Sequence, residues 1–171
     1  MALLDILTVP DSRLREKSLP VEKVDRGIRT LKDNLFDTLY HLNAAGLAAP
    51  QVGVHKRVIV VDVGEHKETS SEPLFMVNPQ IHWMSATTQV TTEGCFSVPT
   101  FFEDVVRPLE IKVSYLDENN HPQLLSASGL LADCIQHEID HLDGVLFIDH
   151  LSLLRRTIIL TKIRKGKQSA R

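Results

Sequence analysis

Two histidines and a glutamate in one short stretch have the types and spacing needed for metal-assisted hydrolysis. Residues 136–144 read QHEIDHLDG and contain the pattern H-E-x-x-H. In a helix, residues four positions apart share a face, so His137 and His141 can direct their imidazoles at one small volume. Such a pair suits a divalent metal, and Glu138 can take a proton from water activated by that metal. The plainer interpretation is a helix with two solvated or core histidines.

A catalytic metal site of this kind needs a third protein ligand, and the residues after the motif supply no obvious one. Catalytic zinc sites keep three protein ligands and one open position. One extended form of the motif would place a third histidine at Phe147, and no glutamate follows Glu138. Asp149 and His150 remain possible ligands. Otherwise the third ligand lies upstream.

Size, charge and cysteine content restrict the class of protein. A chain of 171 residues fits one domain with a real core, so we expect a single domain over residues 1–171. A net charge of -3 argues against nucleic-acid binding by the whole surface. The two cysteines, Cys95 and Cys134, are too few for a disulfide framework, and free thiols or a metal ligand fit a reducing cytosol better than one bridge. We expect no signal peptide and no membrane span.

Apolar periodicity and turn residues predict the elements that position these groups. An amphipathic helix is expected over 23–43, the motif helix begins after an N-cap at Ser128, and a last helix covers 151–165 before Gly166. Asp11 is expected to cap a short helical turn. A hairpin or loop is expected over 64–72, and Asn78-Pro79 should interrupt a strand. The expected strands are 57–63, 74–84, 87–92, 105–107, 111–116 and 123–126.

Two further residues stand in positions that invite chemistry. Gln51 is the polar exception in a run of small residues over 44–53 and can offer its amide to a ligand. Cys95 follows a glycine at the end of an expected strand. The plainer interpretations are an exposed glutamine and a small buried hydrophobe.

Three stretches in order and spacing resemble the bacterial peptide deformylases: GLAAPQ at 46–51, EGCFS at 93–97 and QHEIDH at 136–141. The resemblance covers almost the whole chain. It implies an α+β fold, with mixed or antiparallel β-sheets around a central metal-binding helix, an N-terminal amphipathic helix and a C-terminal helix. It also implies a metal-dependent amide hydrolase of the bacterial cytoplasm. This enzyme would remove the formyl group from N-formylmethionyl nascent peptides and release formate.

The resemblance assigns the metal ligands and the catalytic groups. The ligands would be Cys95, His137 and His141, around one divalent ion. Fe²⁺ is the expected native metal, and Zn²⁺, Ni²⁺ or Co²⁺ can replace it; thiolate and imidazole ligands agree with these ions. Glu138 would act as the base. The side-chain amide of Gln51 and the backbone N–H of Phe96 would face the formyl oxygen as its charge develops.

The resemblance also assigns residues that hold the substrate and the cysteine loop. Glu93 is expected to pair with Arg107 and fix that loop. The peptide would bind as an added strand, and the methionine side chain would enter an apolar pocket beside the ring of His137. The residues assigned to substrate binding are Ala45, Gly46, Gly94, Leu130 and Cys134.

Some positions depart from the family pattern. Ala44 stands where the family usually has glycine. Asp133, at the edge of the arc that holds the two histidines, and Phe102 are both expected on the pocket rim. A carboxylate at that rim should weaken binding of apolar second substrate residues or favour basic ones.

Other functions must be weighed against deformylation. A metallopeptidase that cuts internal bonds would share the ion and Glu138. An inactive metal-binding paralogue is disfavoured because Gln51, Glu138 and all the ligands are present. The basic C-terminal segment, with Arg155, Lys162 and Arg164 among its charges, is usually a solvated face. It can also dock on the ribosome, whereas no motif for sequence-specific nucleic-acid recognition is present. We expect a monomer.

Overall fold

The computed structural model describes residues 2–64 and 72–169, so the loop expected over 64–72 lies almost wholly outside the described residues. Helices α1, α2 and α3 are joined by seven strands and short 3-10 turns. The helices and turns are η1 (Ser12–Arg15), α1 (Arg26–His41), η2 (Ala49–Val52), α2 (Gly129–Leu142), η4 (Phe147–His150) and α3 (Leu153–Ser169). The strands are β1 (Gly46–Ala48), β2 (Val58–Val61), β3 (Leu74–Met84), β4 (Thr88–Cys95), β5 (Val98–Pro108), β6 (Glu110–Leu116) and β7 (Pro122–Ser128).

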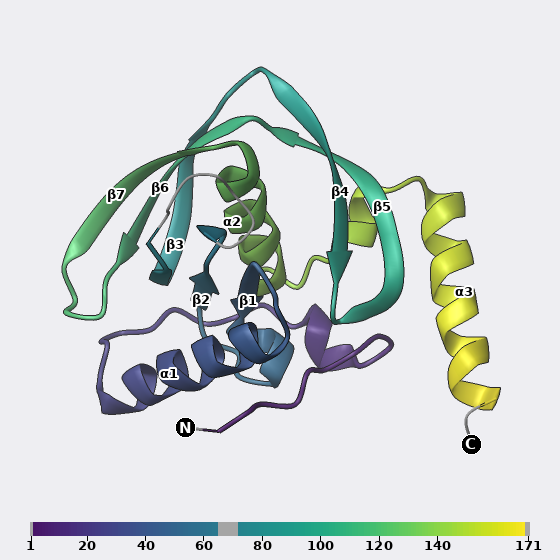
Figure 1. Ribbon diagram of the computed structural model, residues 1–171, viewed down its shortest axis with the longest axis horizontal. Helices are drawn as coiled ribbons and strands as arrows, with labels where there is room; N and C mark the ends of the chain where they lie inside the picture. The colour runs from purple at the N-terminus through teal and green to yellow at the C-terminus, as the bar shows by residue number, and fades with distance from the viewer. Residues whose placement is uncertain (1, 65–71, 170–171) are drawn as a thin grey trace.

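The strands form two sheets, with α2 between them (Figure 1). A five-stranded sheet has the order β1-β2-β3-β6-β7, and β4 pairs with β5 in a separate hairpin. All the strand pairs within these sheets are antiparallel. The expected α+β fold is thereby confirmed, with its central helix and its flanking N-terminal and C-terminal helices.

Strand β2 is buried on both of its faces. Successive side chains of a strand point to opposite faces. Val58 and Val60 therefore pack in the cluster formed with α1, whereas Ile59 and Val61 pack in the cluster formed with α2. Burial of both faces explains why this strand is an uninterrupted run of β-branched residues.

Helix α1 begins later than its apolar spacing predicts, because a cap defines its start. The Asp25 side chain accepts the N–H of Ile28 at 2.9 Å, and the helix begins at Arg26. Below this cap, Leu35 and Leu39 are fully buried against the five-stranded sheet. The amphipathic helix predicted over 23–43 is confirmed with shorter bounds.

The two other predicted caps have different outcomes. Asp11 caps η1, since its Oδ1 accepts the N–H of Arg13 at 3.0 Å. Ser128 occupies the N-cap position of α2, but its side chain makes no capping hydrogen bond within the described chain.

The predicted bounds of α3 and β5 are wrong. Helix α3 continues through Gly166 to Ser169, because this glycine keeps a helical conformation. Strand β5 spans Val98–Pro108 instead of 105–107, because pairing with β4 continues along the hairpin. Strand β3, in contrast, has the predicted bounds, and Asn78-Pro79 interrupts its pairing with β6 as a register shift between Val77 and Gln80.

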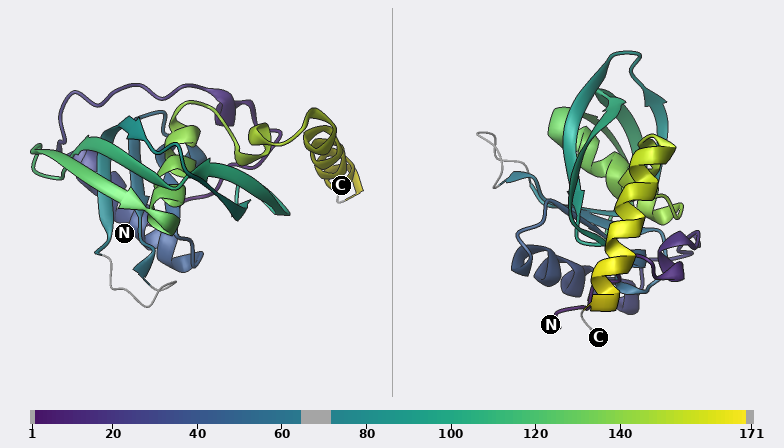
Figure 2. Two further views of the ribbon diagram at one scale, coloured as in Figure 1. Left: turned by 90° about the horizontal axis from the view of Figure 1, so that it is seen from above. Right: turned by 90° about the vertical axis from the view of Figure 1, so that its right-hand side faces the viewer.

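Helix α3 runs along the β4–β5 hairpin (Figures 1 and 2). Its buried residues Ile159 and Ile163 share an apolar cluster with Val98, Val105 and Phe147. This cluster supports the end of β4, where Cys95 lies. Among the described residues, none of the helices has the length and apolar character required to cross a lipid bilayer.

Candidate active site

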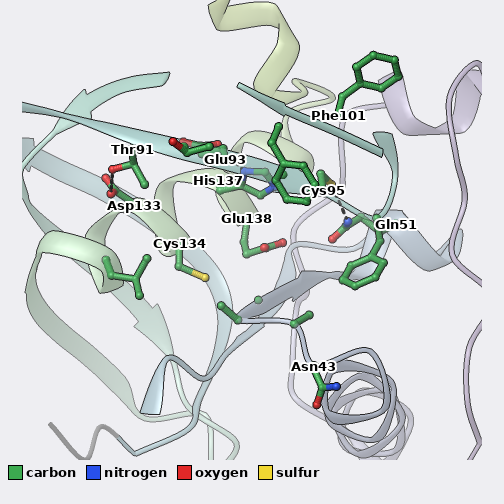
Figure 3. Close-up of a pocket in the computed structure, with 18 of the residues that line it drawn as sticks. Asn43, Gln51, Thr91, Glu93, Cys95, Phe101, Asp133, Cys134, His137 and Glu138 are labelled. Carbon is green, nitrogen blue, oxygen red and sulfur yellow. Dashed lines mark hydrogen bonds and ion pairs between the residues drawn. The ribbon is translucent and has the colours of Figure 1, made fainter. Parts of the chain in front are cut away.

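Three separate elements bring the predicted reactive groups together (Figure 3). Helix α2 carries His137, Glu138 and His141, the end of β4 carries Cys95, and η2 carries Gln51. One ligand atom from each of Cys95, His137 and His141 lies within 4.8 Å of the other two. The Sγ atom of Cys95 is 3.3 Å from Nε2 of His141.

A buried charge network orients His137 from behind. Its Nδ1 lies 2.7 Å from Oε2 of Glu93. Arg107 donates to both oxygens of that carboxylate, including Nη2 to Oε2 at 3.0 Å, so the predicted Glu93–Arg107 pair is confirmed. Burial acts to raise the pKa of Glu93, but the hydrogen bonds from His137 and Arg107 outweigh it and lower that pKa to about 2. With Nδ1 engaged, Nε2 of His137 is the nitrogen left for a ligand bond.

The surroundings of Cys95 favour its thiolate. Burial acts to raise the pKa of this thiol, yet the neighbouring imidazoles of His141 and His137 outweigh burial and hold that pKa well below its usual value. The thiolate is the form of cysteine that binds metals. The cysteine thus meets the first requirement of a ligand.

These three residues fit a metal ion. A tetrahedral ion with bonds of about 2.0–2.3 Å needs donor atoms roughly 3.5 Å apart, which is close to the separation of Cys95 and His141. Their set of one sulfur and two imidazole nitrogens suits iron, zinc or a similar ion and does not suit magnesium or calcium.

Asp149 and His150, the alternative ligands left open by the sequence, are engaged elsewhere. Asp149 pairs with Arg15 and Arg156. His150 lies with Nε2 2.8 Å from Oδ2 of Asp140. The structure therefore brings an upstream cysteine to the histidines, and it does not bring these downstream residues there.

Glu138 lies in the pocket lining near the three donor atoms. Its side chain is 4% exposed, and Oε2 is buried without a hydrogen-bond partner in the described part of the chain. Burial raises the pKa of Glu138 to about 7, although the nearby His137 and His141 oppose this shift. A buried carboxyl with this pKa can both take and return a proton near neutral pH.

Glycine at position 46 makes room for this carboxyl. A Cβ built on Gly46 would lie 2.6 Å from Oε1 of Glu138 and 2.7 Å from Sγ of Cys134. Strand β1 can therefore approach α2 closely only with glycine here.

Gln51 is buried and held by contacts at both ends of its amide. Its Oε1 accepts the N–H of Ala48 at 2.8 Å. Its Nε2 donates to Oγ of Ser97 at 3.2 Å and faces Sγ of Cys95 at 3.4 Å. Sequence reasoning missed the role of Ser97, and its only signal was its place two residues after Cys95.

A pocket of about 550 Å³ opens beside these groups, between β1, α2 and the β4–β5 hairpin. Phe102 is exposed at its lining, as expected for a rim residue. Sequence reasoning did not anticipate Asn43, Thr91 or Phe101 in this lining. The anticipated residues that do line it are Ala44, Ala45, Gly46, Gly94, Phe96, Leu130 and Cys134.

The expectation that Asp133 lies on the pocket rim is wrong. This residue is buried, at 4% exposure, and forms part of the pocket wall. Gln89 and Thr91 of β4 both donate to its Oδ2. These hydrogen bonds hold the side chain against the hairpin and away from solvent.

Comparison with known proteins agrees with this geometry. The family model described as polypeptide deformylase matches residues 3–157. The chain is 50% identical over 165 residues to "Peptide deformylase 1" of Pseudomonas syringae pv. tomato, covering 96% of each chain. It is 46% identical over 168 residues to the peptide deformylase of Methylocella silvestris, covering 97% of this chain and 86% of that protein.

Solved structures give the same result. A peptide deformylase from Ehrlichia chaffeensis in complex with actinonin superposes with a TM-score of 0.92 and 45% identity, covering 97% of this chain and 98% of that one. One from Legionella pneumophila gives a TM-score of 0.89 and 41% identity, covering 99% and 98%. Together with the match to the family model, these similarities show that the chain belongs to the polypeptide deformylase family.

Proposed function

We propose that the chain removes the N-terminal formyl group from N-formylmethionyl peptides, with release of formate, and that Cys95, His137 and His141 hold the required metal ion. Membership of a metal-dependent hydrolase family supports the reaction. The single observation that carries the assignment of the site is the convergence of these three donor atoms within 4.8 Å. A divalent ion held there supplies Lewis-acid activation of water and of the formyl oxygen.

Glu138 moves the proton in this scheme. Its carboxyl accepts a proton from the attacking water as the carbon–oxygen bond forms at the formyl carbon. The carbon–nitrogen bond then breaks, and the same carboxyl returns the proton to the departing amine. The pKa of about 7, raised mainly by burial, suits a group that must perform both transfers.

Gln51 and the backbone N–H of Phe96 stabilise the charge that develops on the formyl oxygen. The Nε2 of Gln51 already faces Sγ of Cys95, and its Oε1 is anchored on the N–H of Ala48, so the donor end is held toward the site. A preorganised donor of this kind contributes about 3–4 kcal/mol to the transition state.

The peptide binds along the free edge of β1. This strand is the first in the order β1-β2-β3-β6-β7, so one of its edges has no strand partner among the described residues. Ala45 and Gly46 at this edge and Gly94 on β4 all line the pocket. An extended substrate between them gains main-chain hydrogen bonds by β-augmentation.

Formate release tests the reaction. Protein prepared without oxygen should release formate from formyl-Met-Ala-Ser, and Glu138→Gln should lower kcat by roughly a hundred- to ten-thousand-fold because the proton carrier is lost. Metal content and thermal unfolding of the variant should match those of the wild type. Internal cleavage of unformylated peptides, in place of formate release, would instead identify a metallopeptidase.

Fe²⁺ is the proposed native metal. The thiolate and imidazole set supports a borderline ion, and the family resemblance favours iron. A ferrous ion bound by a cysteine thiolate is prone to oxidation of the metal and of the sulfur. We expect iron-loaded protein to lose activity in air, while nickel-loaded protein keeps it. Equal loss from both forms would contradict this assignment.

The basic face of α3 is proposed to dock on the ribosome, where the substrate emerges. Lys162 and Arg164 are exposed on this helix, whereas Ile159 and Ile163 anchor it. Charge reversal at Lys162 and Arg164 should therefore reduce cosedimentation with ribosomes without unfolding α3. Charge reversal at Lys17 and Lys23, two exposed lysines far from α3 in the sequence, provides a matched control. Equal losses of ribosome cosedimentation in both variants would argue against docking through α3.

The proposed working form is a monomer in the bacterial cytoplasm. Every residue of the proposed site comes from one chain, so the chemistry requires no second subunit. The thiolate of Cys95 also needs a reducing compartment. Sedimentation equilibrium of the active protein should give the mass of one chain, and a dimer at assay concentration would refute this state.

A further inference from the structure

Phe102 is a large apolar residue that stays exposed at the lining of the substrate pocket. Its exposed fraction is 71%, although phenylalanine is a residue type that folding usually buries. Phe102 belongs to β5 and pairs across the hairpin with Gly94 of β4. Both residues line the pocket shown in Figure 3. The ring is therefore positioned to contact a bound ligand.

Contact with Gly94 fixes where the ring lies. A Cβ built on Gly94 would lie 2.4 Å from Cε1 and 2.5 Å from Cδ1 of Phe102. One edge of the ring thus covers the glycine, as aromatic residues do beside glycines in paired strands. Since most of the residue is nevertheless exposed, the rest of the ring surface stays open to solvent and available to a ligand.

The exposed part of the pocket lining carries no charge. The lining contains three carboxylates, those of Glu93, Asp133 and Glu138, and all three are buried. A rim of this composition offers apolar contact and no ion-pair partner of its own. The exposed residues of the lining are Asn43, Thr92, Phe96, Pro99, Thr100 and Phe102.

The direction of the bound peptide brings its second side chain to this ring. In the proposed binding mode the methionine side chain enters the pocket toward Leu130 and Cys134. Successive side chains of an extended peptide point to opposite sides, so the second side chain points out toward the rim. The formyl group lies beside Cys95, and the main chain that follows it runs past the preceding residue, Gly94. The second residue therefore lies beside the ring of Phe102.

We propose that Phe102 determines specificity for the second substrate residue: its ring packs against that side chain and favours an apolar residue over a polar residue of the same size. This inference rests on the proposed deformylase function and extends it to the residue that follows the formylmethionine. Burial of apolar surface between the ring and the side chain supplies the preference, because a polar side chain at the same place would lose water without gaining a hydrogen bond.

A matched pair of substrates isolates this contact. Formyl-Met-Leu-Ser and formyl-Met-Asn-Ser have second side chains of nearly the same shape, one apolar and one polar. Both side chains are uncharged, so charges near the rim do not enter the comparison. The measured quantity is the ratio of kcat/KM for formate release from the leucyl and asparaginyl peptides with the same metal. We expect the wild-type ratio to be about three to ten, as for partial burial of a leucine side chain.

Phe102→Ala removes the ring and should bring this ratio close to one. The contact is the same before and during the reaction, so its loss should raise KM for the leucyl peptide and leave kcat unchanged. The asparaginyl peptide should keep its wild-type constants. A general disturbance of the hairpin would instead lower kcat for both peptides, because the same hairpin carries Cys95. That result would give Phe102 a structural role and overturn the proposal.

Val106→Ala is the matched control. Val106 is also an exposed apolar residue of β5, but it lies outside the pocket lining. Its truncation should leave the leucyl-to-asparaginyl ratio at the wild-type value. An equal fall of the ratio in Phe102→Ala and Val106→Ala would overturn the proposal.

A gain of preference gives an independent test. Phe102→Glu places a carboxylate at the rim, so formyl-Met-Lys-Ser should gain an exposed ion pair while the leucyl peptide loses its apolar contact. We expect the lysyl-to-leucyl ratio of kcat/KM to rise about fivefold, and added salt should reduce the rise. A loss of folded protein cannot produce such a gain. An unchanged lysyl-to-leucyl ratio would overturn the proposal.

The wild-type enzyme alone can refute the inference. Equal kcat/KM values for the leucyl and asparaginyl peptides, or a higher value for the asparaginyl peptide, would overturn it even if every variant failed to fold. Absence of formate from all these peptides and from formyl-Met-Ala-Ser would instead refute the underlying deformylase function.

Discussion

Nδ1 of His137 lies 2.7 Å from Oε2 of Glu93, a residue only two positions before Cys95. The β4–β5 hairpin therefore supplies one proposed metal ligand and also orients another that belongs to α2. Arg107, across the same hairpin, completes the arrangement by pairing with Glu93 and with Asp140 of α2. The position of the hairpin against the helix and the geometry of the proposed metal site are thus coupled.

Substitution of Glu93 should weaken metal binding. Glu93→Gln keeps the size of the side chain but removes the carboxylate that orients His137. We expect metal affinity to fall roughly 10–100-fold, the usual effect of losing such a partner. Competition with a chromogenic chelator measures it. The control is Glu103→Gln, which removes a carboxylate of the same hairpin that is paired with Arg155 of α3. This variant should keep the wild-type metal affinity. A fall in both variants would exclude a specific role for Glu93.

Substitution of Gly46 should damage the site without destroying the fold. In Gly46→Ala the new methyl group would lie 2.6 Å from Oε1 of Glu138, so the base must move. We expect kcat/KM to fall by about a hundredfold, as for a misplaced catalytic group. Gly166→Ala is the control, because a Cβ there meets nothing within 4 Å. Activity of Gly46→Ala near the wild-type level would show that Glu138 tolerates displacement.

Much of this architecture could be predicted from local patterns. The spacing of His137 and His141 depends only on helical geometry, and the β-branched composition of β2 reflects burial of both its faces. Cys95 could not be joined to the histidines in this way. The contact spans 46 positions in sequence and depends on how the hairpin packs against α2, so the family resemblance was needed to identify it.

The errors arose where tertiary contacts override local signals. Asp133 lies at the edge of the histidine arc, where a carboxylate is usually solvated, but Gln89 and Thr91 from β4 bury it. Glycine commonly terminates a helix by adopting a left-handed conformation, but Gly166 keeps a helical one and α3 continues past it. The full length of β5 depends on its register with β4, which no short stretch of sequence encodes.

Removal of the metal should destabilise the protein. Cys95 packs in the apolar cluster that contains α3, whereas α2 packs in the cluster formed with the five-stranded sheet. A bound ion would link these two clusters through its ligands. Binding to the folded state alone contributes about 2.7 kcal/mol when free metal is at 100 times its dissociation constant. We expect a chelator to lower the Tm of the wild type and to leave that of Cys95→Ser unchanged. Equal Tm values of wild type with and without chelator would contradict metal binding at these residues.

The ion pairs of Asp149 should make stability depend on acid pH. Burial acts to raise the pKa of Asp149, but hydrogen bonds from Arg15 and from the N–H of Leu146 outweigh it and hold that pKa below its usual value of 3.8. The unfolded chain therefore binds the proton more tightly than the folded one. The stabilisation is fully present above the unfolded pKa and is lost as the pH falls through the folded pKa.

Asp149→Asn should thus lower the free energy of unfolding at pH 6. Its effect should shrink as the pH falls through the lowered folded pKa of Asp149, because the wild-type carboxyl then becomes protonated as well. Urea unfolding of both proteins across this range measures the difference. Asp33→Asn, at an exposed carboxylate, should follow the wild-type curve in parallel. A constant offset between wild type and Asp149→Asn at every pH would show that Asp149 acts through packing or neutral hydrogen bonds, because only a carboxylate whose pKa changes on folding can make the two curves converge in acid.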